Sequence, residues 1–333
     1  PLILMGGAAY LRARQLIRQQ ATAQLTGAVS AEFKVLQAWA HTREELIAGR
    51  SQSPGIREPV ATLLAGPGAF ASRTELIDSL RSVQASGNEV LFTDVMVVRA
   101  SDQKVLASTD QNLEGLIAPA VQNGTLPLDQ VATTPVFDDP LFGPDDFAIV
   151  TSTPMRSRGG EVDAYLIGVS RGLRMTSLLD QMQGLWAERG GFREEAGQTY
   201  LTVAPDIVLT LPEYIFATEP EILTGISHPV FALGREEQSG VAEYASLANL
   251  PVVGAYEWSP EQGMGVVLEV PQSEVYAGLS GLAPFSVGLI VFAAMLCFVI
   301  VLITTDRLLR PLGQLTEFAD RISRGEWDHR VPE

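Results

Sequence analysis

Residues 285–305 read FSVGLIVFAAMLCFVIVLITT, an apolar run without a single charged side chain. A hydrocarbon core of ~30 Å is crossed by ~20 apolar residues in a helix, and inside lipid every backbone N–H and C=O must be paired within the segment. The alternative is a buried helix of a soluble protein, but such a helix usually carries a polar stripe. The run therefore predicts a membrane-spanning helix, with the preceding chain on one side of a bilayer and the following chain on the other.

The 333-residue chain carries a formal net charge of −16. This balance argues against a nucleic-acid partner, because the phosphate backbone would repel the chain. The single cysteine, Cys297, lies inside the apolar run and there are three histidines, so a His/Cys zinc site lacks ligands. No Ser-His-Asp order, Gly-rich phosphate loop or HExxH motif occurs. We expect no catalytic residue, no metal and no cofactor in this segment.

The first residues also suggest a membrane helix. Residues 1–11 read PLILMGGAAYL, about half of a membrane helix, and no initiator methionine or signal-peptide region precedes them. We therefore expect the sequence to begin inside a first membrane helix. We also expect an output domain beyond residue 333, because the sequence stops inside the module described below for residues 306–333.

A long helix is predicted over residues 11–49, which contain no proline and, before Gly49, only Gly27 as a helix-weakening glycine. Apolar residues recur there in steps of three and four. The stripe consists of Leu25, Val29, Phe33, Leu36 and Ala40. It can pack the helix onto its own domain, and we expect it to form a seam with a second copy of the chain as well.

Strand-like patterns follow the helix, with residues 51–67 predicted as a connection and residues 74–84 as a short helix. Strands are predicted at residues 89–99, 105–108, 147–154 and 164–170, followed by a helix at 175–185. A weaker second set of strands is predicted at residues 199–203, 206–209, 240–246, 250–258 and 263–269. The fold class is therefore α+β, with a long N-terminal helix carrying two antiparallel-sheet subdomains in series, at residues 51–189 and 190–282.

After the apolar run, a coiled-coil-like stripe is predicted. Pro311 can begin this helix because its missing N–H would be unpaired there anyway, and Gly325 ends it. The stripe and its ends comprise Leu308, Pro311, Leu312, Leu315, Phe318, Ala319, Ile322, Gly325 and Glu326. The proline start and the Gly-Glu end before a short connector resemble the first half of the HAMP module of bacterial transmembrane receptors. The resemblance implies that residues 306–333 are cytoplasmic and transmit a signal.

The region before the apolar run resembles the double Cache sensor domain, whose two subdomains are PAS-like. The matching residues are Val95 to Arg99, Asp102, Ala107 to Asp110, Tyr244, Pro251 to Tyr256, Trp258, Gly263 to Val267, Glu269 and Glu274. The resemblance implies an extracytoplasmic sensor, a parallel homodimer and a ligand pocket in the first subdomain. The Arg-Trp-Tyr-like cluster of amino-acid-binding members is missing between residues 74 and 151, so amino-acid ligands are not favoured.

Two groups of polar residues are candidate ligand sites. An acidic loop contains Asp138, Asp139, Asp145 and Asp146, and hard cations prefer several oxygen ligands. A solvated loop is the alternative, because the spacing is not that of an EF-hand. The second group is Asp94, Thr151 and Tyr165, which lie on predicted strands of one sheet and could face a common pocket. The alternative for these three is exposure to solvent or hydrogen bonding within the core.

Arginines follow both apolar segments in similar numbers, so they do not decide the orientation. The HAMP resemblance places the C-terminus in the cytoplasm and residues 12–282 outside the cell membrane. We expect a signal-transducing receptor whose partners are the lipid bilayer, a second copy of the chain, an unknown small-molecule ligand, and an output domain or response regulator. A histidine kinase is the expected output, with a diguanylate cyclase or a chemoreceptor as alternatives. A structural or adhesive membrane subunit without an output domain is the second hypothesis.

Overall fold

The computed structural model describes residues 2–66, 70–86, 89–137, 139, 141, 147–171, 178, 182, 197–203, 207–210, 221–223, 228–277, 287–288, 291–305, 307 and 323. The chain divides into two compact units, Pro1–Arg18 with Tyr276–Glu333 and Gln19–Val275.

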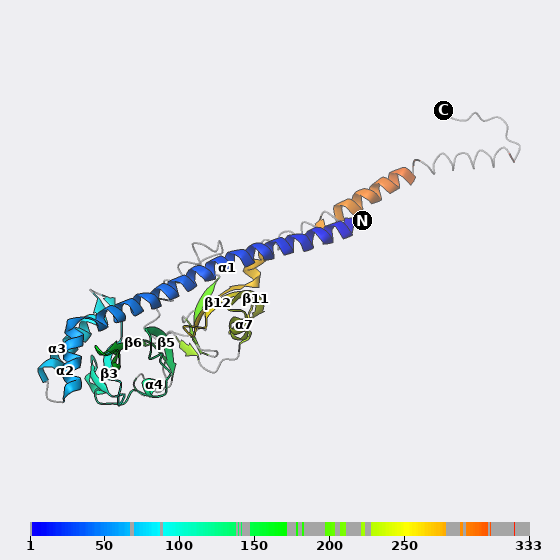
Figure 1. Cartoon of the computed structure of the whole chain (residues 1–333). Helices are drawn as coiled ribbons and strands as arrows, with labels where there is room; N and C mark the ends of the chain where they lie inside the picture. The colour runs from blue at the N-terminus through cyan, green and yellow to red at the C-terminus, as the bar shows by residue number, and fades with distance from the viewer. Residues whose placement is uncertain are drawn as a thin grey trace. The chain divides into compact units, whose positions relative to one another are not determined.

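One helix, α1 (Leu2–Ser51), opens the chain and is the long blue helix of Figure 1. Its 50 residues correspond to ~75 Å at 1.5 Å per residue. The long N-terminal helix predicted from the sequence is confirmed, and the structure extends it back to Leu2.

The apolar stripe of α1 is buried inside its own chain. Its members are Leu25, Val29, Phe33, Leu36 and Ala40, each no more than 4% exposed. These side chains are already withdrawn from solvent by intrachain packing. The packing of this stripe onto its own chain is thus observed, and the seam with a second copy, predicted on Leu25, Val29, Phe33 and Leu36, remains a prediction.

Two further helices follow, α2 (Pro54–Ala65) and α3 (Phe70–Gln84). The prediction of a connection over residues 51–67 was wrong, since α2 occupies most of it. Pro54 sits at the first turn of α2, where its missing N–H removes no intrahelical bond. The apolar face of α2 is buried at Ile56 and Val60, so packing outweighs the turn-like composition.

The first sheet is five-stranded and antiparallel, with the order β4-β3-β7-β6-β5. Its strands are β3 (Asp94–Arg99), β4 (Val105–Ser108), β5 (Ala132–Phe137), β6 (Phe147–Arg156) and β7 (Val162–Arg171). Short elements accompany it: β1 (Ala85–Ser86), β2 (Glu89–Val90), the 3-10 helix η1 (Gln111–Leu113) and α4 (Pro119–Gln122).

Both faces of the first sheet are buried. One face packs against α2 and α3 through a cluster that includes Ile56, Leu80 and Val97. The opposite face, here called the α4 face, packs against α4 through a cluster that includes Val121 and Met96. Successive strand residues point to opposite faces, so the position of a residue along its strand decides which cluster it joins.

The second sheet is six-stranded and antiparallel, with the order β10-β9-β8-β13-β12-β11. Its strands are β8 (Gln198–Val203), β9 (Ile207–Thr210), β10 (Glu221–Leu223), β11 (Ser239–Ala245), β12 (Pro251–Ser259) and β13 (Met264–Pro271). Two helices belong to this part, α7 (Pro229–Glu237) and α8 (Gln272–Val275).

The two sheets share one strand order. Numbering the strands of the first sheet 1 to 5 along the chain gives the spatial order 2-1-5-4-3. The second sheet repeats this order when β8, β9, β11, β12 and β13 are numbered 1 to 5, with β10 added at the edge. The α+β class with a long helix and antiparallel sheets is confirmed, while the predicted boundaries of the two subdomains remain a prediction.

Residues 291–305 are helical and belong to the other unit. Their large apolar side chains are exposed: Phe292 at 64%, Met295 at 67% and Val301 at 60%. Among the residues that the structure describes, none of the helices combines the length and the apolarity that crossing a membrane requires. The predicted HAMP residues from Leu308 to Ile322, together with Gly325 and Glu326, lie outside the described residues.

Candidate functional site

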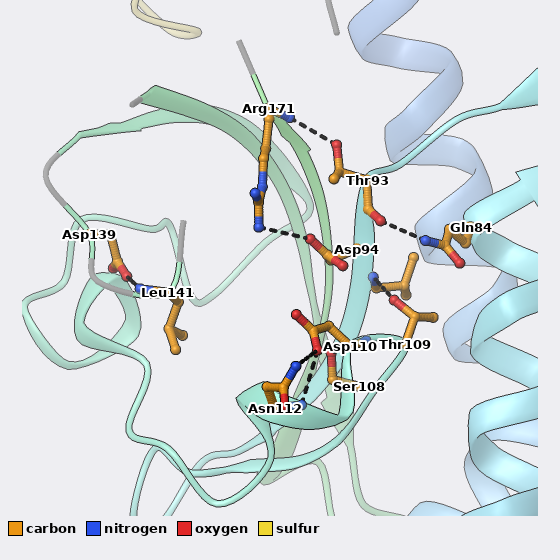
Figure 2. Close-up of polar contacts among 11 residues, drawn as sticks. Gln84, Thr93, Asp94, Ser108, Thr109, Asp110, Asn112, Asp139, Leu141 and Arg171 are labelled. Atoms are coloured by element: carbon orange, nitrogen blue, oxygen red, sulfur yellow. Dashed lines mark hydrogen bonds and ion pairs between the residues drawn. The ribbon is translucent and has the colours of Figure 1, made fainter. Parts of the chain in front are cut away.

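The most distinctive polar contact on the first sheet is an ion pair between Asp94 and Arg171. The antiparallel register pairs Asp94 of β3 with Val169 of β7. Arg171 follows Val169 by two residues on β7, and side chains alternate along a strand. The two side chains therefore lie on the same face. The guanidinium Nη2 of Arg171 is 3.5 Å from the Asp94 Oδ2, and Figure 2 shows the two side chains pointing toward one another.

Burial dominates the electrostatics of Asp94. Its side chain is 12% exposed, whereas that of Arg171 is 40% exposed. Burial raises the pKa of Asp94 above its usual value, the positive charge of Arg171 partly lowers it, and the nearby negative charge of Asp110 raises it further. The carboxylate is thus partly compensated by a cation that can also reach solvent.

Backbone contacts fix both ends of this pair (Figure 2). The backbone N–H of Arg171 donates to the hydroxyl of Thr93 at 3.2 Å, and the amide of Gln84 donates to the Thr93 carbonyl at 2.5 Å. The N–H of Val95 donates to the Thr109 hydroxyl at 2.9 Å. The residues on either side of Asp94 are therefore held by α3 and by the loop after β4.

Two serines share the α4 face with Asp94. Ser108 of β4 pairs with Met96 and is fully buried, and its hydroxyl accepts a hydrogen bond from the N–H of Asp110. Ser152 of β6 is 1% exposed, and its hydroxyl has no hydrogen-bond partner in the described part of the chain. Buried polar groups are nearly always paired, so the Ser152 hydroxyl is able to take a further hydrogen-bond partner on the α4 face.

Tyr165 lies on the same face as Asp94 but not beside it. It pairs with Val98, four positions along the strand from Asp94, which corresponds to ~13 Å at ~3.3 Å per residue. Burial raises the pKa of Tyr165, and the charge of Arg156 partly lowers it. The structure therefore puts Tyr165 at one end of the α4 face and the Asp94–Arg171 pair at the other.

Thr151 is not brought together with Asp94. It is the neighbour of Val150, which belongs to the α4 face, so its side chain lies on the opposite face. Its hydroxyl is hydrogen-bonded to that of Thr133 across β5 and β6 at 3.1 Å, and it is 1% exposed. The predicted common pocket of Asp94, Thr151 and Tyr165 is therefore corrected: Thr151 lies on the other face of the sheet and cannot contribute to it.

Asp139 is 4% exposed and its carboxylate is occupied. One oxygen accepts from the N–H of Ala120 at 2.8 Å, and the other accepts from the N–H of Leu141 at 2.9 Å. Figure 2 shows Asp139 with Leu141, apart from the Asp94–Arg171 pair. Asp138, Asp145 and Asp146 lie outside the described residues, so their predicted role in a ligand site remains a prediction.

In the described residues, no three His, Cys, Asp or Glu side chains come together to hold a metal ion. Sequence reasoning missed Arg171 and Ser152. A signal for Arg171 was present, because Tyr165, Ile167, Val169 and Arg171 alternate along one strand, which places an arginine at the end of an inward-facing row.

No protein-family model and no curated protein matches the chain. Among solved structures, the ligand-binding domain of the Pseudomonas fluorescens chemoreceptor CtaA in complex with L-isoleucine is 12% identical, with a TM-score of 0.48 over 80% of this chain and 99% of that one. The sensor domain of the V. cholerae histidine kinase DctB is 10% identical, with a TM-score of 0.46 over 78% and 98%. The periplasmic domain of RsbU from Chlamydia trachomatis is 14% identical, with a TM-score of 0.42 over 78% and 98%. Because each TM-score is below 0.5, the ligands and activities of these proteins are not transferred to this chain.

Proposed function

We propose that the chain is the sensing part of a transmembrane receptor. In this proposal residues 12–282 are an extracytoplasmic double Cache sensor, residues 285–305 span the cell membrane, and residues 306–333 begin a cytoplasmic HAMP module. The observation that carries the proposal is the repeated 2-1-5-4-3 strand order, present twice in one chain behind a 50-residue helix. Two successive sheets of the same order support the double Cache resemblance seen in the sequence.

The exposed helix at residues 291–305 supports the membrane part of the proposal. Apolar side chains that face water over several turns are unfavourable by roughly 25 cal/mol per Å², and large exposed apolar patches mark interaction or membrane surfaces. Phe298 and Ile300 are 63% and 53% exposed, and no charged residue interrupts residues 291–305. A hydrocarbon environment removes this cost.

The ligand proposed for the sensor is a polar small molecule bound on the α4 face of the first sheet. Asp94 supplies a buried acceptor, Arg171 supplies a cation that is partly exposed, and Ser152 supplies a hydroxyl without a partner in the described residues. A molecule with both donor and acceptor groups would pair with Asp94 and Arg171 at the same time. The site thus offers complementary charges within an otherwise apolar and buried face of the sheet.

Signalling then requires that the ligand binds one of two sensor arrangements more tightly than the other. The shift would pass through residues 285–305 to the HAMP stripe, and from there to a cytoplasmic output, which we propose to be a histidine kinase acting on a response regulator. A diguanylate cyclase or a chemoreceptor output is the alternative. A structural or adhesive subunit is the competing function, and the gene sequence after Glu333 separates the two: a second HAMP helix with an output domain supports the receptor, and a stop codon supports the subunit.

Cysteine labelling in a bacterial host tests the topology. In a Cys297→Ala background, Ser101→Cys in the turn after β3 should react with a membrane-impermeant maleimide in intact cells. Asp328→Cys should react only after the cells are permeabilised. Equal labelling of both positions in intact cells, or recovery of the chain in the soluble fraction, would overturn the proposal.

A further inference from the structure

A glutamate is buried where α1 packs on the second sheet. Glu32 of α1 is 0% exposed, and its carboxyl group lies against Thr199 of β8. The hydroxyl of Thr199 lies 3.1 Å from Oε1 and 3.2 Å from Oε2 of Glu32. One hydroxyl therefore serves both oxygens of a fully buried carboxyl group.

The surroundings of this carboxyl group are apolar. On the sheet, Thr199 pairs with Leu268, and the next residues on the same face are Leu201 and Val266, all buried. On the helix, the residues one turn before and after Glu32 are Ala28 and Leu36, which are also buried. A carboxylate can accept about four hydrogen bonds, and these apolar neighbours offer no side-chain donor.

No charged group of the described chain compensates Glu32. On α1, Lys34 is exposed to solvent. On the second sheet, Glu257 shares the face of Thr199 but pairs with Val266 and is half-buried. Glu269 of β13 is the neighbour of Leu268 and points to the opposite face, where it accepts a hydrogen bond from the hydroxyl of Tyr200 at 2.8 Å.

Burial raises the pKa of Glu32 to about 8, although the hydrogen bond from Thr199 lowers it in part. The group therefore holds its proton at neutral pH and loses it in mildly alkaline solution. Once ionised, it would be a buried charge with a single hydroxyl donor, which is a costly state that the chain can relieve by letting water reach the carboxylate.

We propose that Glu32 is a proton-binding site that controls how firmly α1 packs on the second sheet. With the proton bound, the contact between α1 and β8 is closed; when the proton leaves, this contact loosens. The inference rests on the proposed function only for its consequence, namely that external pH would bias a helix of the sensor. The ligand of the site is the proton itself.

Infrared difference spectroscopy on the full chain in detergent micelles tests the titration directly. Between pH 6 and pH 9 the wild type should lose the C=O band of one protonated carboxyl group, and Glu32→Gln should lack this change. Thr199→Val should move the midpoint to higher pH, because it removes the hydrogen bond that favours the charged form. The matched control is Glu75→Gln, an exposed glutamate of α3, which should leave the band and its midpoint unchanged.

Amide hydrogen exchange of residues 25–36, corrected for the intrinsic pH dependence, tests the packing. Opening should become roughly a hundredfold more frequent in the wild type at pH 9 than at pH 6, and should stay constant in Glu32→Gln. The pKa of Glu32, about 8, lies two units above pH 6, and each pH unit below that pKa shifts the opening equilibrium about tenfold. A pH-independent band in the wild type, or equal exchange in both proteins at pH 9, would overturn the proposal. Neither readout depends on signalling or on membrane topology, so a failure of the receptor proposal would be seen separately.

Discussion

The hydroxyl of Thr199 holds the carboxyl group of Glu32 at 3.1 and 3.2 Å and thereby joins β8 to α1 across 167 positions of sequence. This is a long-range polar contact inside an apolar interface, so its protonation state bears on the stability of the whole packed unit. A buried carboxyl group contributes to stability in its neutral form and opposes folding in its charged form.

The free energy of unfolding should accordingly fall as the pH rises through a defined range. The pKa of Glu32 is raised from 4.5 to about 8 on folding, so between these values the folded chain binds one proton more than the unfolded chain. Its contribution is fully present below pH 4.5, declines by about 1.4 kcal/mol per pH unit, and is exhausted above pH 8. Urea unfolding at several pH values should show this slope in the difference between the wild type and Glu32→Gln.

The same measurement on Glu75→Gln provides the control, because the Glu75 side chain is exposed to solvent and removing its charge disturbs no buried contact. A wild-type stability that stays parallel to that of Glu32→Gln from pH 5 to pH 8 would contradict the assignment of a raised pKa.

Asp139→Ala should destabilise the first sheet region. The carboxylate accepts from two backbone N–H groups, those of Ala120 and Leu141, and both donors would be left unpaired in a buried place. Each such loss costs about 1–3 kcal/mol, so the free energy of unfolding should drop by about 2 kcal/mol or more. Asp129→Ala, at an exposed position, should change it by no more than about 0.5 kcal/mol. Equal effects of the two variants would show that Asp139 is not an anchor.

Much of the fold could be predicted because strands and helices differ in their apolar period. The predicted strand at residues 105–108 coincides with β4, and that at residues 164–170 lies within β7. The strand β5 was not predicted, because Pro135 argues against a strand. In the structure β5 is an edge strand, where proline is tolerated. The helix α2 was not predicted, because Pro54 at its first turn is also typical of a loop.

The candidate site was harder to predict because both faces of the first sheet are buried. Alternation of apolar and polar residues shows which side chains face the core only when the other face of the sheet is exposed to solvent. Thr151 and Asp94 therefore seemed equivalent in the sequence, whereas the register places them on opposite faces. The partner of Asp94 depends on which strands are neighbours, and this is a property of the topology rather than of local sequence.

Gly168→Ala should be strongly unfavourable although Gly168 lies in a regular strand. A Cβ atom there would lie 2.6 Å from two ring carbons of Phe92, which is 1% exposed and cannot move freely. Overpacking of this kind costs about 1–3 kcal/mol. Thermal unfolding should show the loss. Gly159→Ala, in the turn between β6 and β7, should not show it, because a Cβ atom there would meet only the Ser157 Oγ, at an ordinary contact distance of 3.6 Å. In the Gly168→Ala background, Phe92→Leu should cost less than in the wild type, because a smaller side chain relieves the contact.

Leu315→Glu should abolish signalling and leave the sensor folded. A charge on the predicted HAMP stripe opposes its packing with a second helix, whereas the unit Gln19–Val275 does not include residue 315. The measurements are the output of the complete receptor in cells and the unfolding curve of the sensor. Glu317→Gln, off the predicted stripe, serves as the control. Unchanged output in Leu315→Glu would contradict transmission through this segment.

The electrostatics of Asp94 make two opposite predictions. Arg171→Gln should raise the pKa of Asp94 further, because the charge that favours the carboxylate is removed, and Asp110→Asn should lower it, because a repelling charge is removed. Carbon-13 NMR titration of aspartate-labelled chain measures both shifts. Asp78→Asn, at an exposed site on α3, should leave the titration unchanged. If both variants shifted the pKa of Asp94 in the same direction, the ion pair with Arg171 would not be the contact that compensates this buried carboxylate, and the polar site on the α4 face would lose its basis.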